Sequence, residues 1–160
     1  MARTFTATAR TSLVLLAMCA LPCAARAVEE AELKAAIVYN ILMYVTWPPE
    51  TLPPGGGPVR LCVSASNATS AAIRALQGRD MGGMPLEVAE FSPATAPAAT
   101  RQCHAVFVDA SDRVKSAAPL IAQRTQGALV LSDDPDAPTD TTAVVLLRTG
   151  SKVSFEVNLQ

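Results

Sequence analysis

The stretch that decides the predicted fold is Lys34-Ala35-Ala36-Ile37-Val38-Tyr39-Asn40-Ile41-Leu42-Met43-Tyr44-Val45-Thr46-Trp47-Pro48. Strong helix formers and a Glu30–Lys34 pair four residues apart predict a helix over residues 29–46, which Pro48 and Pro49 end. Apolar side chains recur at helical spacing along one face, which we expect to be buried: Leu33, Ile37, Ile41 and Tyr44.

Two residues of this stretch are candidates for a more specific role. Asn40 falls in the centre of the apolar face, so we expect its side chain to be buried and hydrogen-bonded, either to backbone groups of a sheet or to a ligand. Trp47 follows the helix, where a lone tryptophan serves as a packing anchor or lies at the rim of a groove.

The first 27 residues predict a secretory signal peptide. Arg3 and Arg10 precede an apolar segment over residues 13–21, and Ala25-Arg26-Ala27 provides small residues for cleavage. The apolar segment is too short for a membrane span, which needs about 20 residues. A lipidated cysteine usually follows a small residue, whereas Cys19 follows Met18 and Cys23 follows Pro22, so we expect no lipid anchor. We therefore expect residues 1–27 to be removed, leaving a soluble exported domain over residues 28–160.

The charge and the cysteine content of the chain indicate which kinds of protein it can be. Cleavage removes three arginines and no acidic residue, so the net charge falls from −1 to −4. A mildly acidic chain without a basic run does not suit nucleic-acid binding. The mature chain keeps two cysteines, Cys62 and Cys103, and an even pair in an oxidising compartment indicates a structural disulfide. A redox-sensing pair is the alternative.

The remaining pattern predicts an α/β fold, a single-domain mixed β-sheet flanked by helices. Helices are expected from Ser66 or Asn67 to Leu76 and over residues 113–125. A turn at Thr149-Gly150-Ser151 predicts a C-terminal β-hairpin, whose last strand alternates apolar and polar residues and should be half buried. The expected strands cover residues 59–64, 85–91, 103–109, 128–131, 143–147 and 153–159.

Few residues suit catalysis or metal binding. His104 is the single histidine, so a hydrolytic set would have to be built around one sheet residue. An acidic run containing Asp133, Asp134, Asp136 and Asp140 lacks the glycine and terminal glutamate of a calcium loop, which favours a solvated loop. We expect no enzyme activity, no cofactor and no metal.

Four segments of the chain together resemble the YfiR-like family of periplasmic proteins. They are Lys34-Ala35-Ala36 continuing through Asn40 to Trp47-Pro48, Leu61-Cys62-Val63, the strand Gln102-Cys103-His104-Ala105-Val106-Phe107-Val108, and Val153-Ser154-Phe155-Glu156-Val157-Asn158-Leu159. The resemblance implies an α/β domain with a Cys62–Cys103 disulfide. It also implies that Asn40, Trp47, Phe155 and Asn158 define the fold. We take the same four residues as candidates for a ligand or partner groove.

The same resemblance implies a function. Members of this family often dimerise, and the best-known kind bind the periplasmic domain of an inner-membrane diguanylate cyclase and hold it inactive, while an outer-membrane lipoprotein can sequester them. We therefore expect a periplasmic, non-catalytic, negative regulator of cyclic di-GMP and biofilm signalling. The alternatives are a small-molecule binding module with a groove near Trp47 and, ranked last, a hydrolase using His104.

The chain departs from the family pattern at its end. Members usually continue past the last strand into another helical segment, whereas this sequence stops at Gln160. We therefore expect the family's usual final helix to be lacking and apolar strand surface to be exposed.

Overall fold

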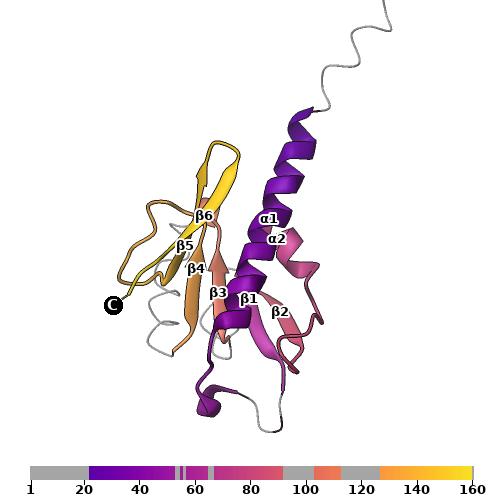
Figure 1. Ribbon diagram of the computed structural model, residues 1–160, viewed down its shortest axis with the longest axis vertical. Helices are drawn as coiled ribbons and strands as arrows, with labels where there is room; N and C mark the ends of the chain where they lie inside the picture. Colours follow the sequence, from indigo (N-terminus) through magenta and orange to yellow (C-terminus); the bar gives the residue numbers. More distant parts are fainter. Residues whose placement is uncertain are drawn as a thin grey trace, which may run out of the picture.

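The fold is built on a mixed β-sheet, seen in a computed structural model that describes residues 22–52, 55, 57–64, 67–91, 103–112 and 127–159. Within these residues six strands follow the order β2-β1-β3-β4-β5-β6 (Figure 1). The first five run parallel, and β6 is antiparallel to β5. The strands are β1 (Val59–Ser64), β2 (Leu86–Phe91), β3 (Ala105–Val108), β4 (Leu129–Ser132), β5 (Val144–Thr149) and β6 (Lys152–Val157). The predicted mixed sheet with a C-terminal hairpin is confirmed.

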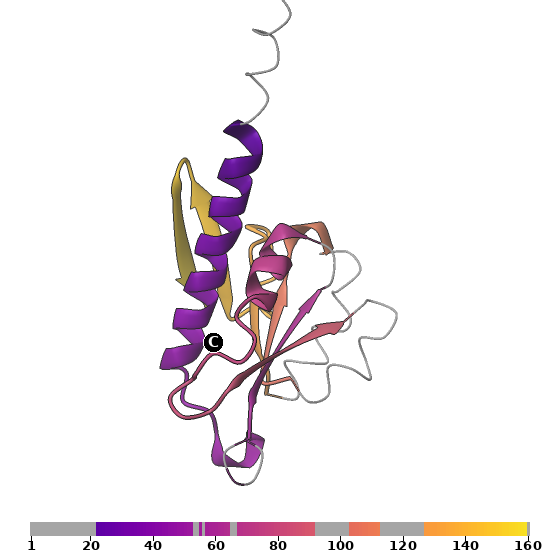
Figure 2. The ribbon, with the colours of Figure 1, turned by 90° about the vertical axis from the view of Figure 1, so that its right-hand side faces the viewer.

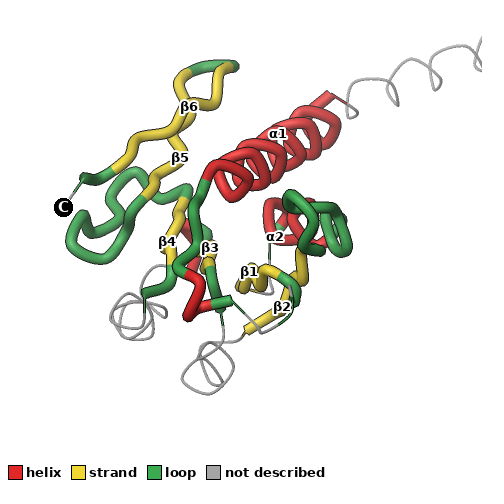
Figure 3. The backbone as a smooth tube through the Cα atoms, turned by 60° about the horizontal axis from the view of Figure 1, so that its bottom comes forward, coloured by secondary structure: helices red, strands yellow, loops and turns green. Residues whose placement is uncertain are grey.

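The described helices lie on one side of this sheet (Figure 3). They are α1 (Pro22–Tyr44) and α2 (Ala68–Arg74), with short 3-10 turns η2 (Pro49–Thr51) and η3 (Ala110–Asp112). Helix α1 begins within residues 1–27, the segment predicted to be cleaved. The helix expected over residues 113–125 lies outside the described residues. Neither α1 nor any other described helix is long and apolar enough to cross a membrane.

The predictions of β1 and α2 from the local sequence are confirmed. The strand β1 has the predicted bounds, with Leu61 and Val63 facing the helices and Cys62 facing the opposite side. The Asn67 side chain caps α2 by accepting a hydrogen bond from the Ser70 backbone N–H at 2.7 Å. Because β1 lies inside a parallel sheet, it is buried on both faces rather than one.

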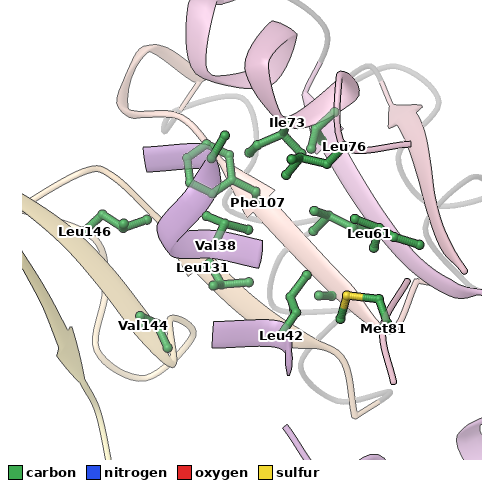
Figure 4. Close-up of a cluster of buried hydrophobic side chains, with 14 residues drawn as sticks. Val38, Leu42, Leu61, Ile73, Leu76, Met81, Phe107, Leu131, Val144 and Leu146 are labelled. Atoms are coloured by element: carbon green, nitrogen blue, oxygen red, sulfur yellow. The ribbon is translucent and has the colours of Figure 1, made fainter. Parts of the chain in front are cut away.

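The main core lies between the sheet and the two helices (Figure 4). Side chains from all the layers meet there and are almost completely buried, including Val38, Leu42, Leu61, Ile73, Phe107, Leu131 and Leu146. Burying one such side chain stabilises the fold by about 1.5–3 kcal/mol. A second, smaller cluster covers the opposite face and contains Cys62, Phe91, Val106, Val108, Ala128 and Val130.

The face of α1 that packs into the core differs from the predicted one. The buried residues are Ala31, Ala35, Val38 and Leu42. Of the four residues predicted to face the core, Ile37 and Ile41 are partly buried against it, whereas Leu33 is 44% exposed and Tyr44 is 90% exposed. The predicted burial of Asn40 is wrong for the same reason, since this residue is exposed on the solvent side. Helix α1 carries two apolar stripes, and the one containing alanines allows α1 to approach α2 closely.

A cluster of charged groups fixes the rotation of α1 on the sheet. Lys34 Nζ lies 2.8 Å from Asp133 Oδ2 and 3.1 Å from Glu30 Oε1. Arg148, in β5, pairs with Glu30 at 2.8 Å. The lysine and aspartate side chains are only 13% and 4% exposed, so this pair is well shielded from water.

The pKa of Lys34 reflects these contacts. Burial lowers it, but the hydrogen bonds and charges of Asp133 and Glu30 outweigh burial and raise the pKa above its ordinary value of 10.5. Asp133 is held in place by its own bond, because its Oδ1 accepts the Ala110 N–H at 2.9 Å. The cluster therefore connects α1 with the carboxyl ends of β3 and β4.

The last strand is more exposed than the alternating pattern predicts. Phe155 and Val157 remain 51% and 52% exposed, and Leu159 is 92% exposed, although Val153 packs partly against the core. The strand β6 is at the edge of the sheet, and α1 passes beside the hairpin without covering it (Figure 2). The expectation of a half-buried last strand is therefore wrong, whereas the expected apolar exposure is observed.

The disulfide joins Cys62 to Cys103, with their Cα atoms 5.9 Å apart. It closes a segment with a sequence separation of 41 and lies beside the second cluster, where Cys62 is 1% exposed. This bond ties β1 to the residues that enter β3. It therefore stabilises the centre of the sheet.

Cys62→Ser should lower the melting temperature by about 10 °C or more, because a loop of this size contributes about 4 kcal/mol in the chain-entropy account. Thermal unfolding followed by circular dichroism measures the change, and a thiol reagent should label Cys103 in the variant. The Cys62→Ser/Cys103→Ser double variant is the control, since its melting should not respond to reductant. A wild-type melting curve that reductant leaves unchanged would contradict a stabilising disulfide.

Lys34→Met should destabilise the protein by about 3 kcal/mol at neutral pH, because it leaves the buried Asp133 carboxylate unpaired. Since the folded pKa of Lys34 is raised, its contribution is complete below pH 10.5 and is lost as the pH rises through the folded pKa. Urea unfolding should therefore show wild type and variant converging at alkaline pH.

Asp133→Asn provides the matched comparison, because the amide oxygen can still accept the Ala110 N–H. Its combination with Lys34→Met should cost less than the sum of the two single changes. Two results would contradict the coupling between Lys34 and Asp133. One is a double variant whose loss of stability equals the sum of the single losses. The other is a stability difference between wild type and Lys34→Met that does not change with pH.

Candidate functional site

His104 is held as a structural link by both of its ring nitrogens. Its Nδ1 accepts the Arg60 backbone N–H at 2.8 Å, which places the proton on Nε2, and Nε2 donates to the Thr51 carbonyl at 2.8 Å. The residue is 8% exposed. These bonds join η2 to the starts of β1 and β3, and they leave neither nitrogen available as a general base.

Trp47 borders a shallow groove at the amino end of β4. Its ring meets His104 edge-on, with the ring centroids 5.7 Å apart. The groove has a volume of about 270 Å³ and is lined by residues of the α1–η2 connection, of β4 and of the segment before β5, namely Val45, Thr46, Trp47, Pro48, Gly127, Ala128, Leu129, Val130, Thr141 and Ala143. Small-molecule sites usually occupy about 300–1,000 Å³, so this groove is small for one.

The predicted groove residues do not come together as one site. Asn158 lies near the Trp47 groove, where its side chain donates to the Thr142 carbonyl and its backbone N–H to the Ala143 carbonyl, both at 2.8 Å. Phe155 lies on the exposed edge strand, and Asn40 lies on the solvent side of α1. Asn158 therefore fastens the end of the chain to the start of β5.

A second groove runs between α1 and α2, with a volume of about 570 Å³. Most of its lining is alanine, with Glu32 and Arg79 as the charged members. A small-molecule site needs a few convergent polar groups to orient its ligand, and this lining offers few. The groove is a consequence of the small residues that let the two helices approach.

The acidic run is partly buried rather than a solvated loop. Asp133 pairs with Lys34, and the buried Asp134 accepts the Asp136 backbone N–H through Oδ1 at 3.0 Å. The prediction of a solvated loop is wrong for these two residues, because the run follows directly from the buried strand β4. In the described part of the chain no group of three or more metal-ligating side chains comes together.

The solvent side of α1 is the surface that sequence reasoning missed. We call Leu33, Ala36, Asn40, Met43 and Tyr44 the outer face of α1; all five are exposed and uncharged. The exposed Glu29 and Glu32 lie on the same side of the helix, nearer its start. Surface helices normally carry charged or polar residues on the side opposite the core. The sequence does contain a signal for this surface, because Leu33 and Tyr44 belong to the apolar stripe that the pattern predicted to face the core.

The apolar residues of the outer face are substantially exposed. Met43 is 44% exposed, like Leu33, and Tyr44 is almost fully exposed. Aromatic residues and methionine are enriched at the centres of protein interfaces, whereas charged residues are depleted there. Met43 and Tyr44 of the outer face are therefore of the residue types enriched in interface cores, whereas Glu29 and Glu32 on the same side of the helix are not.

Comparison with known protein families identifies the family of this chain. None of the curated proteins matches the chain. Residues 31–160, most of the chain, match the family described as YfiR/HmsC-like, and the match includes all of the outer face, both disulfide cysteines and β6. The chain therefore belongs to the YfiR/HmsC-like family, whose members are periplasmic regulatory proteins.

Proposed function

We propose that this protein is an exported, periplasmic, non-catalytic regulator that binds the periplasmic domain of an inner-membrane diguanylate cyclase and holds it inactive. The observation that carries the proposal is the group of exposed apolar residues on the outer face of α1, in a chain that belongs to a regulatory family. The role fits cyclic di-GMP and biofilm signalling. An outer-membrane lipoprotein that captured the regulator would relieve the restraint.

The spacing of the outer face suits recognition by a partner groove. Leu33, Ala36, Asn40 and Tyr44 are separated by three, four and four residues, so they follow one side of the helix. A helix that binds in a groove presents anchors at this spacing. The partner that matches this face is an apolar protein groove rather than a charged surface.

Asn40 gives this face its specificity in the proposed complex. Its side chain is the single amide in an otherwise apolar surface except for the Tyr44 hydroxyl, and it can both donate and accept hydrogen bonds. A partner that buries this amide without pairing it loses about 1–3 kcal/mol. The correct partner therefore needs a polar group opposite Asn40.

Inhibition follows from unequal binding to two states of the cyclase. A regulator shifts an equilibrium only as far as its affinities for the two states differ. Moving a cyclase from almost fully active to almost fully inactive takes a difference of about 5.5 kcal/mol. A few buried anchors on the outer face of α1 can supply such a difference without any chemical step.

The proposal is tested by measuring cellular cyclic di-GMP in the bacterium that carries this gene. Deletion should raise cyclic di-GMP, and the wild-type gene should restore the lower level. Met43→Lys/Tyr44→Lys should fail to restore it, because two charges are placed on the proposed contact face. Glu50→Lys is the matched control, since it adds a lysine at an exposed position outside α1 and should restore the wild-type level.

Equal amounts of each folded variant in the periplasm, checked by immunoblot and by thermal melting of the purified proteins, are required for the comparison. Unchanged cyclic di-GMP after deletion would overturn the proposed function. Full restoration by Met43→Lys/Tyr44→Lys would overturn the assignment of the contact face alone.

A further inference from the structure

The groove between α1 and α2 is open to solvent and has small side chains along its walls. The two helices lie side by side (Figures 1 and 3), and the groove between them has a volume of about 570 Å³. Surface helices normally carry charged or polar residues on the side that faces solvent. Helix α2 and the turn after it instead present exposed alanines to the groove, three and four residues apart, namely Ala68, Ala71 and Ala75.

One charged side chain lies toward each end of this groove. Glu32 lines it on α1, and Arg79 lines it beyond the end of α2. The Arg79 guanidinium lies over the Tyr39 ring, with Cζ 4.6 Å from the ring centroid, so it is beside a residue seven positions after Glu32 on α1. Because a helix rises about 1.5 Å per residue, the two charges are about 10 Å apart along α1.

Both charges are available to a partner. Glu32 and Arg79 are exposed, and in the part of the chain that the structure describes neither forms an ion pair. Stacking on Tyr39 restrains the Arg79 guanidinium but leaves its N–H groups free to donate hydrogen bonds. The guanidinium is therefore held at this end of the groove in a position to bind an acidic group.

The neighbouring carboxylates do not reverse this polarity. Glu29 is exposed one turn before Glu32 and adds to the negative charge at that end. Asp80 follows Arg79, but its carboxylate oxygens accept the backbone N–H groups of its own loop, at 3.2 Å from Gly82 and 2.9 Å from Gly83. The groove therefore has an acidic end and an end that offers a guanidinium.

These features fit an amphipathic helix of a partner protein. Alanine side chains leave shallow holes between two helices, which large apolar side chains of a third helix can fill. A small molecule needs convergent polar groups, whereas Glu32 and Arg79 lie at opposite ends. Side chains on one face of a helix are three or four residues apart, so the partner's two charges lie two turns apart with two large apolar residues between them.

The charges also set the direction of the partner helix. Opposite charges meet when an acidic residue of the partner lies against Arg79 and a basic residue lies against Glu32. Helices favour acidic residues toward their N-terminus and basic residues toward their C-terminus. The partner helix therefore runs from Arg79 toward Glu32, antiparallel to α1.

We propose that the groove between α1 and α2 binds an amphipathic helix of a partner protein, antiparallel to α1, with the pattern acidic-x-x-apolar-apolar-x-x-basic. The outer face of α1 and the lining of the groove share Ala36 alone. The proposal does not depend on the proposed function, because its test measures peptide binding to the purified protein rather than cyclic di-GMP.

Two synthetic helical peptides of opposite polarity test the charges. One carries Glu-x-x-Leu-Leu-x-x-Lys and the other Lys-x-x-Leu-Leu-x-x-Glu, each about 15 residues long and stapled on its outer side, since short isolated helices are marginal in water. Fluorescence anisotropy should show that the wild-type protein binds the first peptide about tenfold more tightly, because the second replaces two ion pairs by like-charge contacts. Glu32→Lys/Arg79→Glu should reverse the preference.

A leucine at position 71 tests the groove itself. Ala71→Leu should weaken binding of the first peptide by about tenfold or more, because the added side chain occupies the space of the partner's leucines. The melting temperature should stay the same, since Ala71 is exposed and leucine is a good helix former. Thr139→Leu is the matched control, because it adds a leucine at an exposed position outside both helices and should bind like wild type.

Disulfide cross-linking tests the direction of the bound helix. When the first peptide carries a cysteine at its N-terminal end, it should cross-link to Ala75→Cys, one turn before Arg79, faster than to Ala68→Cys at the start of α2. Four results would each overturn the proposal. They are a wild-type protein that binds neither peptide, a preference that Glu32→Lys/Arg79→Glu leaves unchanged, full binding by Ala71→Leu, and faster cross-linking at Ala68→Cys.

Discussion

The docking of α1 is the constraint on which the other surfaces depend. Helix α1 has apolar residues on two sides, but Glu29, Glu32 and Asn40 lie on the solvent side, so hydrophobic burial favours the side containing Val38. The ion pair between Lys34 and Asp133 forms in this orientation and adds to it. The stripe with Leu33 and Tyr44 is then left partly exposed.

Signals local in sequence predicted most of the fold. The alternation around Cys62 predicted β1 with its observed bounds, and Asn67, one of the two residues expected to cap α2, is the cap in the structure. Thr149-Gly150-Ser151 predicted the turn of the hairpin. In the structure Gly150 has a φ of 63°, a conformation that glycine adopts at little cost. Each of these features depends on residues within a few positions of one another, so a short stretch of sequence is enough to predict it.

The errors came from contacts between distant residues. Lys34 and Asp133 are separated by 99 positions, and no periodicity reveals that they meet. The hydrophobic pattern predicted the wrong face of α1 because it gives large side chains more weight than alanines. The structure buries Ala31 and Ala35, since small side chains let α1 pack closely against α2. Burial of β6 was overestimated because alternation predicts which face is apolar but not whether a helix covers it.

The same features keep the outer face of α1 apart from the edge of the sheet. The outer face of α1 points away from the sheet, whereas β6 is the last strand in the sheet order. An edge strand with an exposed apolar face invites pairing with other chains and therefore aggregation. Charged side chains are one means by which natural proteins limit such pairing, and β6 carries two of them, Lys152 and Glu156, both exposed. The exposed apolar residues of β6 are therefore accompanied by charges along the same strand, whereas Met43 and Tyr44 at the end of α1 are not.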